Sequence, residues 1–188
     1  FTVGTPFVMG ATNFHLVANF QDRGFSDALA VSVLSVFAAV SALSMFPLGL
    51  LLEHIHVRHG GMLMTALLMA AMLLISVADS YVEAMIFAVL FGLATGMRAI
   101  IETLLIANYF GRRSLGTIRG FARTWTVIST IGPVFGGFTQ DITGTYTITF
   151  LVFAVASGLM FLTMLFAIPP VKKIHGDVLA RQQPAPTS

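Results

Sequence analysis

The sequence predicts an all-α membrane protein with six transmembrane helices, and three observations lead to this class. Of the 188 residues, 56% are hydrophobic and only 10% are charged, whereas a soluble domain carries about 25% charged residues. The mean hydropathy is +0.89. Long stretches such as 28–52 and 62–78 carry no charged residue, and each can cross about 30 Å of hydrocarbon.

Helices are the only secondary structure that fits these stretches. A backbone in lipid must satisfy its own hydrogen bonds, so it forms helices or closed barrel strands. Barrel strands alternate apolar and polar residues, and these stretches do not alternate. In chain order we expect helices over 3–20, 28–52, 61–78, 84–109, 117–140 and 147–168.

Short polar connections join the six segments, and no soluble domain is indicated. The bundle accounts for residues 1–173. Residues 174–188 have little apolar surface to bury, so we expect a disordered tail. The chain contains no cysteine, so neither disulfides nor thiolate metal sites are available.

The basic residues predict how the bundle is oriented. On one side of the alternating helix count lie Arg58, Arg112, Arg113, Lys172, Lys173 and Arg181. The opposite side has only Arg23, which stands among Asp and Glu residues. Cytoplasmic loops are rich in Lys and Arg. We therefore expect both ends of this even-numbered bundle, and the tail, on the cytoplasmic side.

The fourth segment contains the strongest polar signal, Arg98 and Glu102. Their spacing of four places them on one helix face, at depths of ~15 Å and ~9 Å below Asn108 by helix rise. Arg119 and Arg123 repeat the spacing on the fifth segment. Charges inside a membrane usually face a cavity or pair with one another. The excess of arginine favours an anion site, while a structural Arg–Glu clamp is the alternative.

The first segment has a polar stripe at helical spacing, formed by Thr5, Thr12, His15 and Asn19. Such a stripe either lines water or joins helices through hydrogen bonds. His15 could relay protons near neutral pH, although a simple hydrogen-bonded histidine is the more common case. Both interpretations stay open at this point.

Two glycine pairs at a spacing of four predict close helix packing. Gly92 and Gly96 lie in the fourth segment, and Gly132 and Gly136 in the fifth. Pro133 removes one backbone hydrogen bond and is expected to bend the fifth helix.

Signatures of enzymes, cofactors and nucleic-acid binding are missing. No nucleophile and base stand at catalytic spacing, so we expect no enzyme and no cofactor. The loop histidines His54, His56 and His59 are more simply explained as solvated residues than as metal ligands, so no metal site is expected. The pI near 9.4 reflects the side-specific basic residues, and we expect no nucleic-acid partner.

Three motifs resemble the major facilitator superfamily. The loop Gly49-Leu50-Leu51-Leu52-Glu53-His54-Ile55-His56-Val57-Arg58 is similar to its Gly-x-Leu-x-Asp-Arg-x-Gly-Arg-Lys motif, with Gly49, Leu51, Glu53 and Arg58 matching. The run Gly132-Pro133-Val134-Phe135-Gly136-Gly137 resembles its Gly-Pro-x-x-Gly-Gly helix motif. The run from Asn108 to Gly120 resembles the loop before the eleventh helix of bacterial members near the monocarboxylate and oxalate–formate porters.

This resemblance implies helices seven to twelve of a twelve-helix transporter in a bacterial-type inner membrane, with the N-terminal half missing. In that family the first and fourth helices of each half line the central cavity, which would place His15, Asn19, Arg98 and Glu102 there. The segment 28–52 lacks the substrate arginine that monocarboxylate-type porters carry there. Arg98 or Arg123 could replace it.

The function expected from the sequence is the C-terminal half of a secondary transporter that works by alternating access. Its partners would be a small organic anion such as a carboxylate, protons as coupling ion, the lipid bilayer and the missing N-terminal half. Arg98, Glu102, Arg123, His15 and Asn19 would contact the solute, and Gly49, Glu53 and Arg58 would form the gating loop. The alternative is a six-helix membrane scaffold or assembly module that transports nothing.

Overall fold

The computed structural model describes residues 4–110, 116, 120 and 127–166. The elements in this part are α1 (Gly4–Asp22), α2 (Asp27–His54), α3 (Val57–Val77), α4 (Tyr81–Phe110), the short 3-10 helix η2 (Val127–Thr130), α6 (Ile131–Thr143) and α7 (Thr147–Phe166). Among the described residues there is no strand, so the all-helical class expected from the sequence is confirmed.

Four of these helices are long and apolar enough to span a membrane, namely α2, α3, α4 over Tyr81–Leu105, and α7. The 19-residue helix α1 carries threonine, asparagine and histidine side chains along its length. The 13 residues of α6 extend over only about 20 Å. The expected fifth segment, 117–140, is described only at residue 120 and from Val127 onward.

Polar residues extend several helices beyond their apolar segments. Helix α2 begins at Asp27, where the Ser26 hydroxyl accepts a hydrogen bond from the Leu29 amide. Such a cap satisfies one of the free N–H groups of the first turn. Helix α3 begins at Val57, before its apolar run, and therefore includes Arg58. Charged residues such as Asp27 and Arg58 therefore lie in the first turns of helices rather than in loops.

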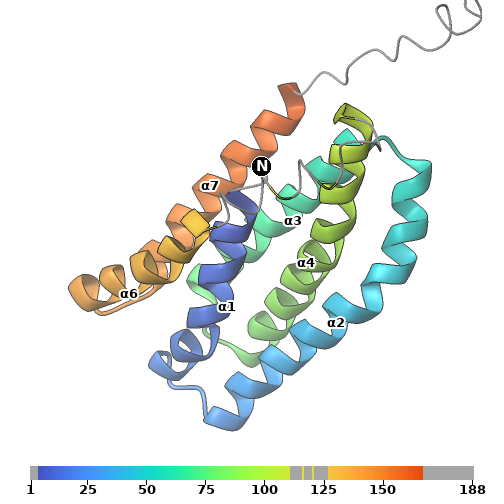
Figure 1. Ribbon diagram of the computed structural model, residues 1–188. Coiled ribbons are helices and arrows are strands. Elements are labelled where there is room, and N and C mark those ends of the chain that lie inside the picture. The colour runs from blue at the N-terminus through green and yellow to red at the C-terminus, as the bar shows by residue number, and fades with distance from the viewer. Residues whose placement is uncertain (1–3, 111–115, 117–119, 121–126, 167–188) are drawn as a thin grey trace, which may run out of the picture.

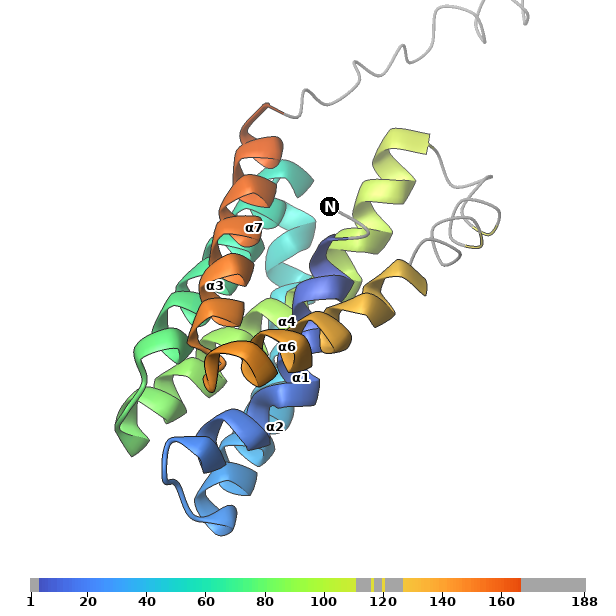
Figure 2. The same cartoon turned by 90° about the vertical axis from the view of Figure 1, so that its left-hand side faces the viewer.

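The helices form one bundle in which α4 lies between α2 and α3 (Figure 1). Helix α3 packs against α7 on its other side, and the two run side by side in Figure 2. Helix α1 packs mainly against η2 and α6, with further contacts to α2 and α7. Helix α4 is therefore flanked by α2 and α3, while α1 is flanked by α2, α6 and α7.

Aromatic rings join α1, α2 and α4. The rings of Phe87 and Phe91 stack with their centroids 5.4 Å apart. Phe37 of α2 lies 4.9 Å from Phe91, and Phe20 of α1 lies 6.3 Å from Phe87. Phe20, Phe87 and Phe91 are fully buried. This cluster fills the space between the three helices in the N-terminal half of α4.

Glycines allow α2 and α4 to approach closely. A Cβ atom on Gly92 would lie 2.9 Å from the Val40 side chain and 3.0 Å from the Phe37 carbonyl oxygen. A Cβ atom on Gly96 would lie 2.5 Å from Ser44 Oγ and 2.9 Å from the Ser41 carbonyl oxygen. Because backbone atoms are involved, a side chain at either position would push the two helices apart.

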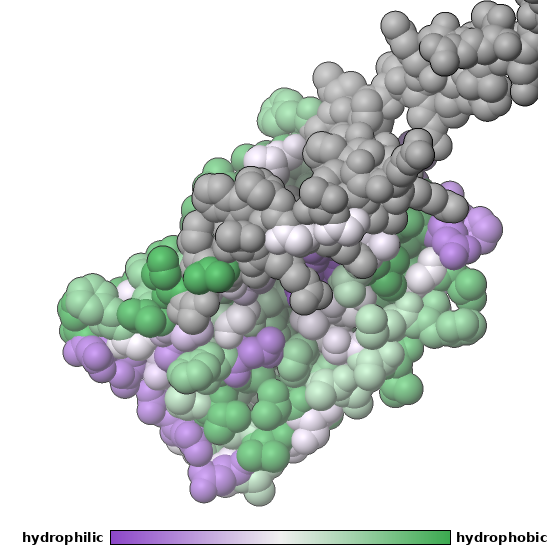
Figure 3. Space-filling view, in the orientation of Figure 1, coloured by the Kyte–Doolittle hydropathy of each residue, from purple (hydrophilic) through white to green (hydrophobic). Residues whose placement is uncertain are grey.

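The surface of the bundle is largely apolar (Figure 3). Large hydrophobic side chains such as Phe14, Leu43 and Phe46 are at least 74% exposed. In Figure 3 hydrophilic residues gather at the lower left edge, where the α1–α2 and α6–α7 turns lie, and apolar residues cover the surface between the ends. An apolar band with polar ends is the surface expected of a protein in a bilayer.

Candidate functional site

Arg98 and Glu102 form an ion pair on α4. Arg98 Nη1 lies 3.6 Å from Glu102 Oε2, and the two side chains are 33% and 25% exposed. Charge-assisted hydrogen bonds normally measure about 2.7–2.9 Å, so this contact is loose. Within the described part of the chain, neither side chain makes a hydrogen bond. The guanidinium therefore keeps donors available for another group.

The pair lies on the same face of α4 as the aromatic cluster, farther toward the C-terminus of the helix. Phe91, Thr95, Arg98 and Glu102 follow one another at spacings of three or four, which keeps them on one face. Phe91 is buried, while Thr95, Arg98 and Glu102 are half-buried. The aromatic cluster buries the N-terminal part of this face. Arg98 and Glu102 lie farther toward the C-terminus of α4, where the face is partly exposed.

His15 is buried between α1 and α6. Its Nε2 lies 2.7 Å from the Pro133 carbonyl oxygen; because a carbonyl can only accept, Nε2 carries a proton that it donates. The imidazole lies with its centroid 5.0 Å from the Tyr146 ring. Gly136 makes room for it, since a Cβ atom there would lie 2.6 Å from His15 Cδ2. His15 thus links the two helices.

His15 and Asn19 do not cluster with Arg98 and Glu102. The ends of α1 and α3 meet at an Arg23–Asp79 ion pair of 2.9 Å, so the C-terminus of α1 and the N-terminus of α4 lie at the same end of the bundle. Counted from that end by helix rise, His15 lies about 10 Å and Arg98 about 25 Å along their helices. The polar residues expected at one site therefore occupy two depths.

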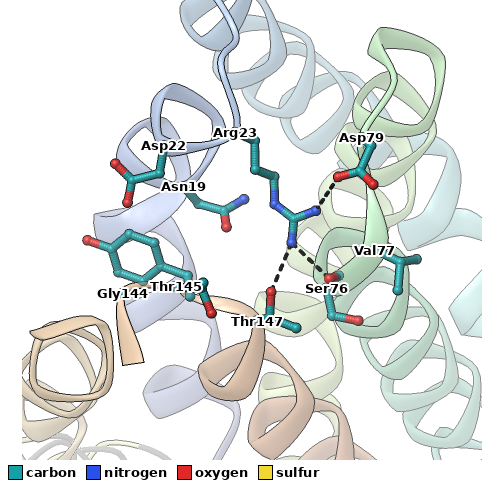
Figure 4. Close-up of a pocket in the computed structure, with 10 residues that line it drawn as sticks. Asn19, Asp22, Arg23, Ser76, Val77, Asp79, Gly144, Thr145 and Thr147 are labelled. Atoms are coloured by element: carbon teal, nitrogen blue, oxygen red, sulfur yellow. Dashed lines mark hydrogen bonds and ion pairs between the residues drawn. The ribbon is translucent and has the colours of Figure 1, made fainter. Parts of the chain in front are cut away.

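Arg23 is an interaction centre that the sequence interpretation missed (Figure 4). Its Nη1 donates to the Ala78 carbonyl at 3.1 Å and to Asp79 at 2.9 Å. Its Nη2 donates to the Ser76 carbonyl at 2.8 Å and to Thr147 Oγ1 at 3.3 Å. One guanidinium thereby joins the turn after α1 to the end of α3 and the start of α7. The sequence did contain a signal for this contact, because Arg23 and Asp79 have opposite charges and lie in two turns at the same end of the predicted bundle.

A polar cavity of about 420 Å³ lies beside Arg23. Asn19 is only 2% exposed and its amide points into this cavity (Figure 4), where Nδ2 has no partner among the described residues. Burial raises the pKa of the Tyr146 phenol, and the carboxylates of Asp22 and Asp141 raise it further. The cavity thus contains an arginine whose two Nη groups are bonded, next to a tyrosine that is influenced by two carboxylates.

The loop-motif residues do not contact one another. Arg58 donates to the Leu165 carbonyl at the end of α7, and its Nε is buried with no partner in the described part. Glu53 is exposed. Gly49 is open, with Ile100 Cδ1 the nearest atom at 3.9 Å from an added Cβ. Among the described residues no group of three or more potential metal ligands occurs.

Arg123, the remaining expected site residue, lies outside the described residues, as do Arg112, Arg113 and Arg119. The described candidate site therefore consists of Arg98 and Glu102, with Thr95 below them.

A family-model comparison gives a match along nearly the whole chain. The model of the Major Facilitator Superfamily matches residues 2–187. No curated protein gives a significant match.

Proposed function

This chain belongs to the major facilitator superfamily, a family of secondary transporters, and we propose that it forms the C-terminal six-helix half of a twelve-helix carrier for a small organic anion. Membership makes it a multi-pass membrane protein with a role in transport. The family consists of transporters rather than enzymes. The solute, its charge and the half-transporter organisation are the parts we propose.

The half-transporter organisation is supported by the uncovered face of α1. Asn13 and Phe14 are exposed, Phe14 by 74%, although other faces of α1 pack against α2, α6 and α7. A second six-helix unit placed against this face would enclose the solute between the two halves. Solute sites of such carriers lie near the membrane midplane at the interface between repeats, and one repeat rocks against the other.

The observation that best supports an anion is the difference between Arg98 and Arg23. Arg23 makes four hydrogen bonds, one of them a 2.9 Å ion pair with Asp79, so its Nη donors are used in holding helix ends together. Within the described part of the chain, Arg98 has a single polar contact, of 3.6 Å to Glu102. A guanidinium with free donors inside an apolar segment suits a carboxylate or phosphate group, which its planar fork can bind with two hydrogen bonds.

Glu102 has a second role in this proposal. In the empty carrier it partly neutralises Arg98 and lowers the cost of a charge in the membrane. An arriving anion competes for the guanidinium, and Glu102 then moves aside. Arg123, on the fifth segment, would add a second positive charge at a similar depth.

His15 and Asn19 belong to a different level of the solute path in this proposal. They would hydrogen-bond water or solute about 15 Å from Arg98 along the bundle, and protons remain the proposed coupling ion. The proposed setting is a bacterial-type inner membrane with both chain ends cytoplasmic.

Arg98→Gln tests the proposal in the full-length carrier. We expect uptake of the anion to be abolished or its affinity to fall by roughly 2–5 kcal/mol, the range for breaking a buried charge pair, with little loss of protein abundance. Arg98→Lys should rescue only in part, because an ammonium lacks the fork. Arg23→Gln is the matched control and should lower abundance instead. Normal uptake by Arg98→Gln, measured per folded molecule, would refute the anion site.

A further inference from the structure

Hydroxyl groups inside the helices of this protein usually donate to the preceding turn. Thr12 donates to the Val8 carbonyl at 2.7 Å, Thr65 to Gly61 at 2.9 Å and Ser157 to Phe153 at 2.7 Å. On α4 itself, Thr103 donates to the Ala99 carbonyl at 2.8 Å. This back-bond is the common way for a helical threonine or serine to satisfy its hydroxyl in an apolar setting.

Thr95 departs from this pattern. Its Oγ1 is buried and has no hydrogen-bond partner among the described residues, including the carbonyl one turn earlier. A buried hydroxyl without a partner costs about 1–3 kcal/mol, and unsatisfied groups of this kind are few in native structures. An explanation is therefore needed for this position and for no other threonine in the described residues.

Thr95 lies next to the Arg98–Glu102 pair on the same face of α4. It lies one turn below Arg98 and two turns below Glu102, within about 60° of both around the helix axis. The adjacent Gly96 holds α4 against Ser41 and Ser44 of α2, so the backbone at Thr95 has a fixed position. Thr95 is the next residue on this face after Arg98 in the direction of the aromatic cluster, so an oxygen held on that side of the guanidinium would have the Thr95 hydroxyl as its neighbouring donor on α4.

We propose that Thr95 is a further substrate-contacting residue, whose hydroxyl donates a hydrogen bond to an oxygen of the anionic group held by Arg98. In this proposal the hydroxyl lacks a hydrogen-bond partner in the empty protein and gains one when an oxyanion is bound. This inference rests on the proposed function, because it requires an anion at Arg98. The ligand class is a carboxylate or phosphate group, since both present several oxygens to the two donors.

Binding of acetate and inorganic phosphate to the purified full-length carrier tests this role, with thermal stabilisation as the readout. Thr95→Val keeps the shape and removes the hydroxyl. We expect it to weaken the apparent affinity for the better-bound anion by roughly 10- to 100-fold, the effect of one hydrogen bond to a charged group. In the absence of anion its melting temperature should stay the same or rise, because an unsatisfied hydroxyl is removed. Thr95→Ser keeps the donor and should bind within a few-fold of the wild type.

Thr65→Val is the matched control, since it removes a hydroxyl that is fully buried and already bonded to Gly61. It should leave anion affinity unchanged. If Thr95→Val binds as tightly as the wild type while Arg98→Gln does not bind, the role of Thr95 is overturned and the anion site stands. If neither acetate nor phosphate stabilises the wild-type protein, the anion site and the role of Thr95 are both overturned.

Discussion

At the scale of single residues, the arginines of this chain differ in how fully their donors are used. Arg23 is engaged by two carbonyls, a carboxylate and a hydroxyl. Arg58 contacts the last turn of α7 through the Leu165 carbonyl, where the helix dipole favours a cation. Among the described residues, Arg98 contacts Glu102 alone, at 3.6 Å. Arg23 is thus held by its Nη donors and Arg58 by the end of α7, whereas Arg98 lies half-buried within an apolar segment with a single loose carboxylate contact among the described residues.

Arg23→Gln should destabilise the bundle and lower its melting temperature. It removes four hydrogen bonds that tie α1 to α3 and α7, and we expect a loss of about 1–3 kcal/mol, within the usual range for a broken network. Thermal unfolding in detergent measures this. A carrier whose melting temperature is unchanged but whose uptake is lost would assign Arg23 to the solute path instead.

Tyr146 should make the bundle sensitive to alkaline pH. Because burial and nearby carboxylates raise the pKa of its phenol above 10.0, the folded protein keeps this proton to a higher pH than the unfolded chain. Stability from this group is complete below pH of about 10 and falls as the pH rises through the folded pKa. Tyr146→Phe should lose less stability across that window in pH-dependent melting. Parallel curves for both proteins would contradict this cause.

At the scale of the helices, glycines decide which elements approach closely. Gly92 and Gly96 bring α4 against α2, and a Cβ atom on Gly132 would lie only 2.8 Å from the Phe7 carbonyl oxygen of α1. The glycine pairs recognised in the sequence therefore face two different partners. Periodicity identifies the small-residue face of a helix but does not identify the helix that packs there.

Gly96→Ala should separate α2 from α4 and lower the melting temperature, because the new Cβ would lie 2.9 Å from the Ser41 carbonyl oxygen. The displaced segment also carries Thr95 and Arg98, so anion affinity should fall. Gly137→Ala is the control, since the nearest described atom to its added Cβ, His15 Cε1, lies 4.0 Å away, an ordinary van der Waals distance. It should be neutral or slightly stabilising, as alanine favours helix. Equal melting temperatures for both variants would argue against the close approach.

The sequence predicted where the helices lie along the chain better than it predicted which helices pack together. Long apolar runs indicated the cores of α2, α3, α4 and α7, because high mean hydropathy over about 20 residues is enough to identify a span. Arg58 was assigned to a loop, although it lies in the first turn of α3, since a polar turn does not differ from a loop in hydropathy. His15 was expected with Arg98, but the order of packing around α1 directs it to Pro133. Helical spacing shows which residues share one face of a helix, but it does not show which other helix packs against that face.

At the scale of the whole molecule, the charges and the bundle agree on two distinct ends. Arg23, Asp79 and Thr147 meet at one end, while Arg58 and the end of α7 meet at the other. The proposed orientation places the first end outside and the second in the cytoplasm, following the excess of Lys and Arg.

Single-cysteine labelling tests this orientation directly, because the chain contains no cysteine. Ser80→Cys, in the exposed turn between α3 and α4, should react with an impermeant maleimide added to intact cells. His56→Cys and Arg112→Cys should react only after the membrane is permeabilised. Labelling of the position 112 cysteine in intact cells would reverse the proposed topology.

Solute charge is the most direct test of the central proposal, that this carrier half binds an anion at Arg98. The measurement is uptake by proteoliposomes containing the full-length carrier, with a panel of small carboxylates compared against tetramethylammonium and with Arg98→Gln as the inactive reference. We predict saturable uptake of at least one carboxylate, its loss in Arg98→Gln, and no uptake of tetramethylammonium, because the walls around Arg98 strengthen its repulsion of a cation. Saturable uptake of the cation together with exclusion of every carboxylate would contradict the proposal.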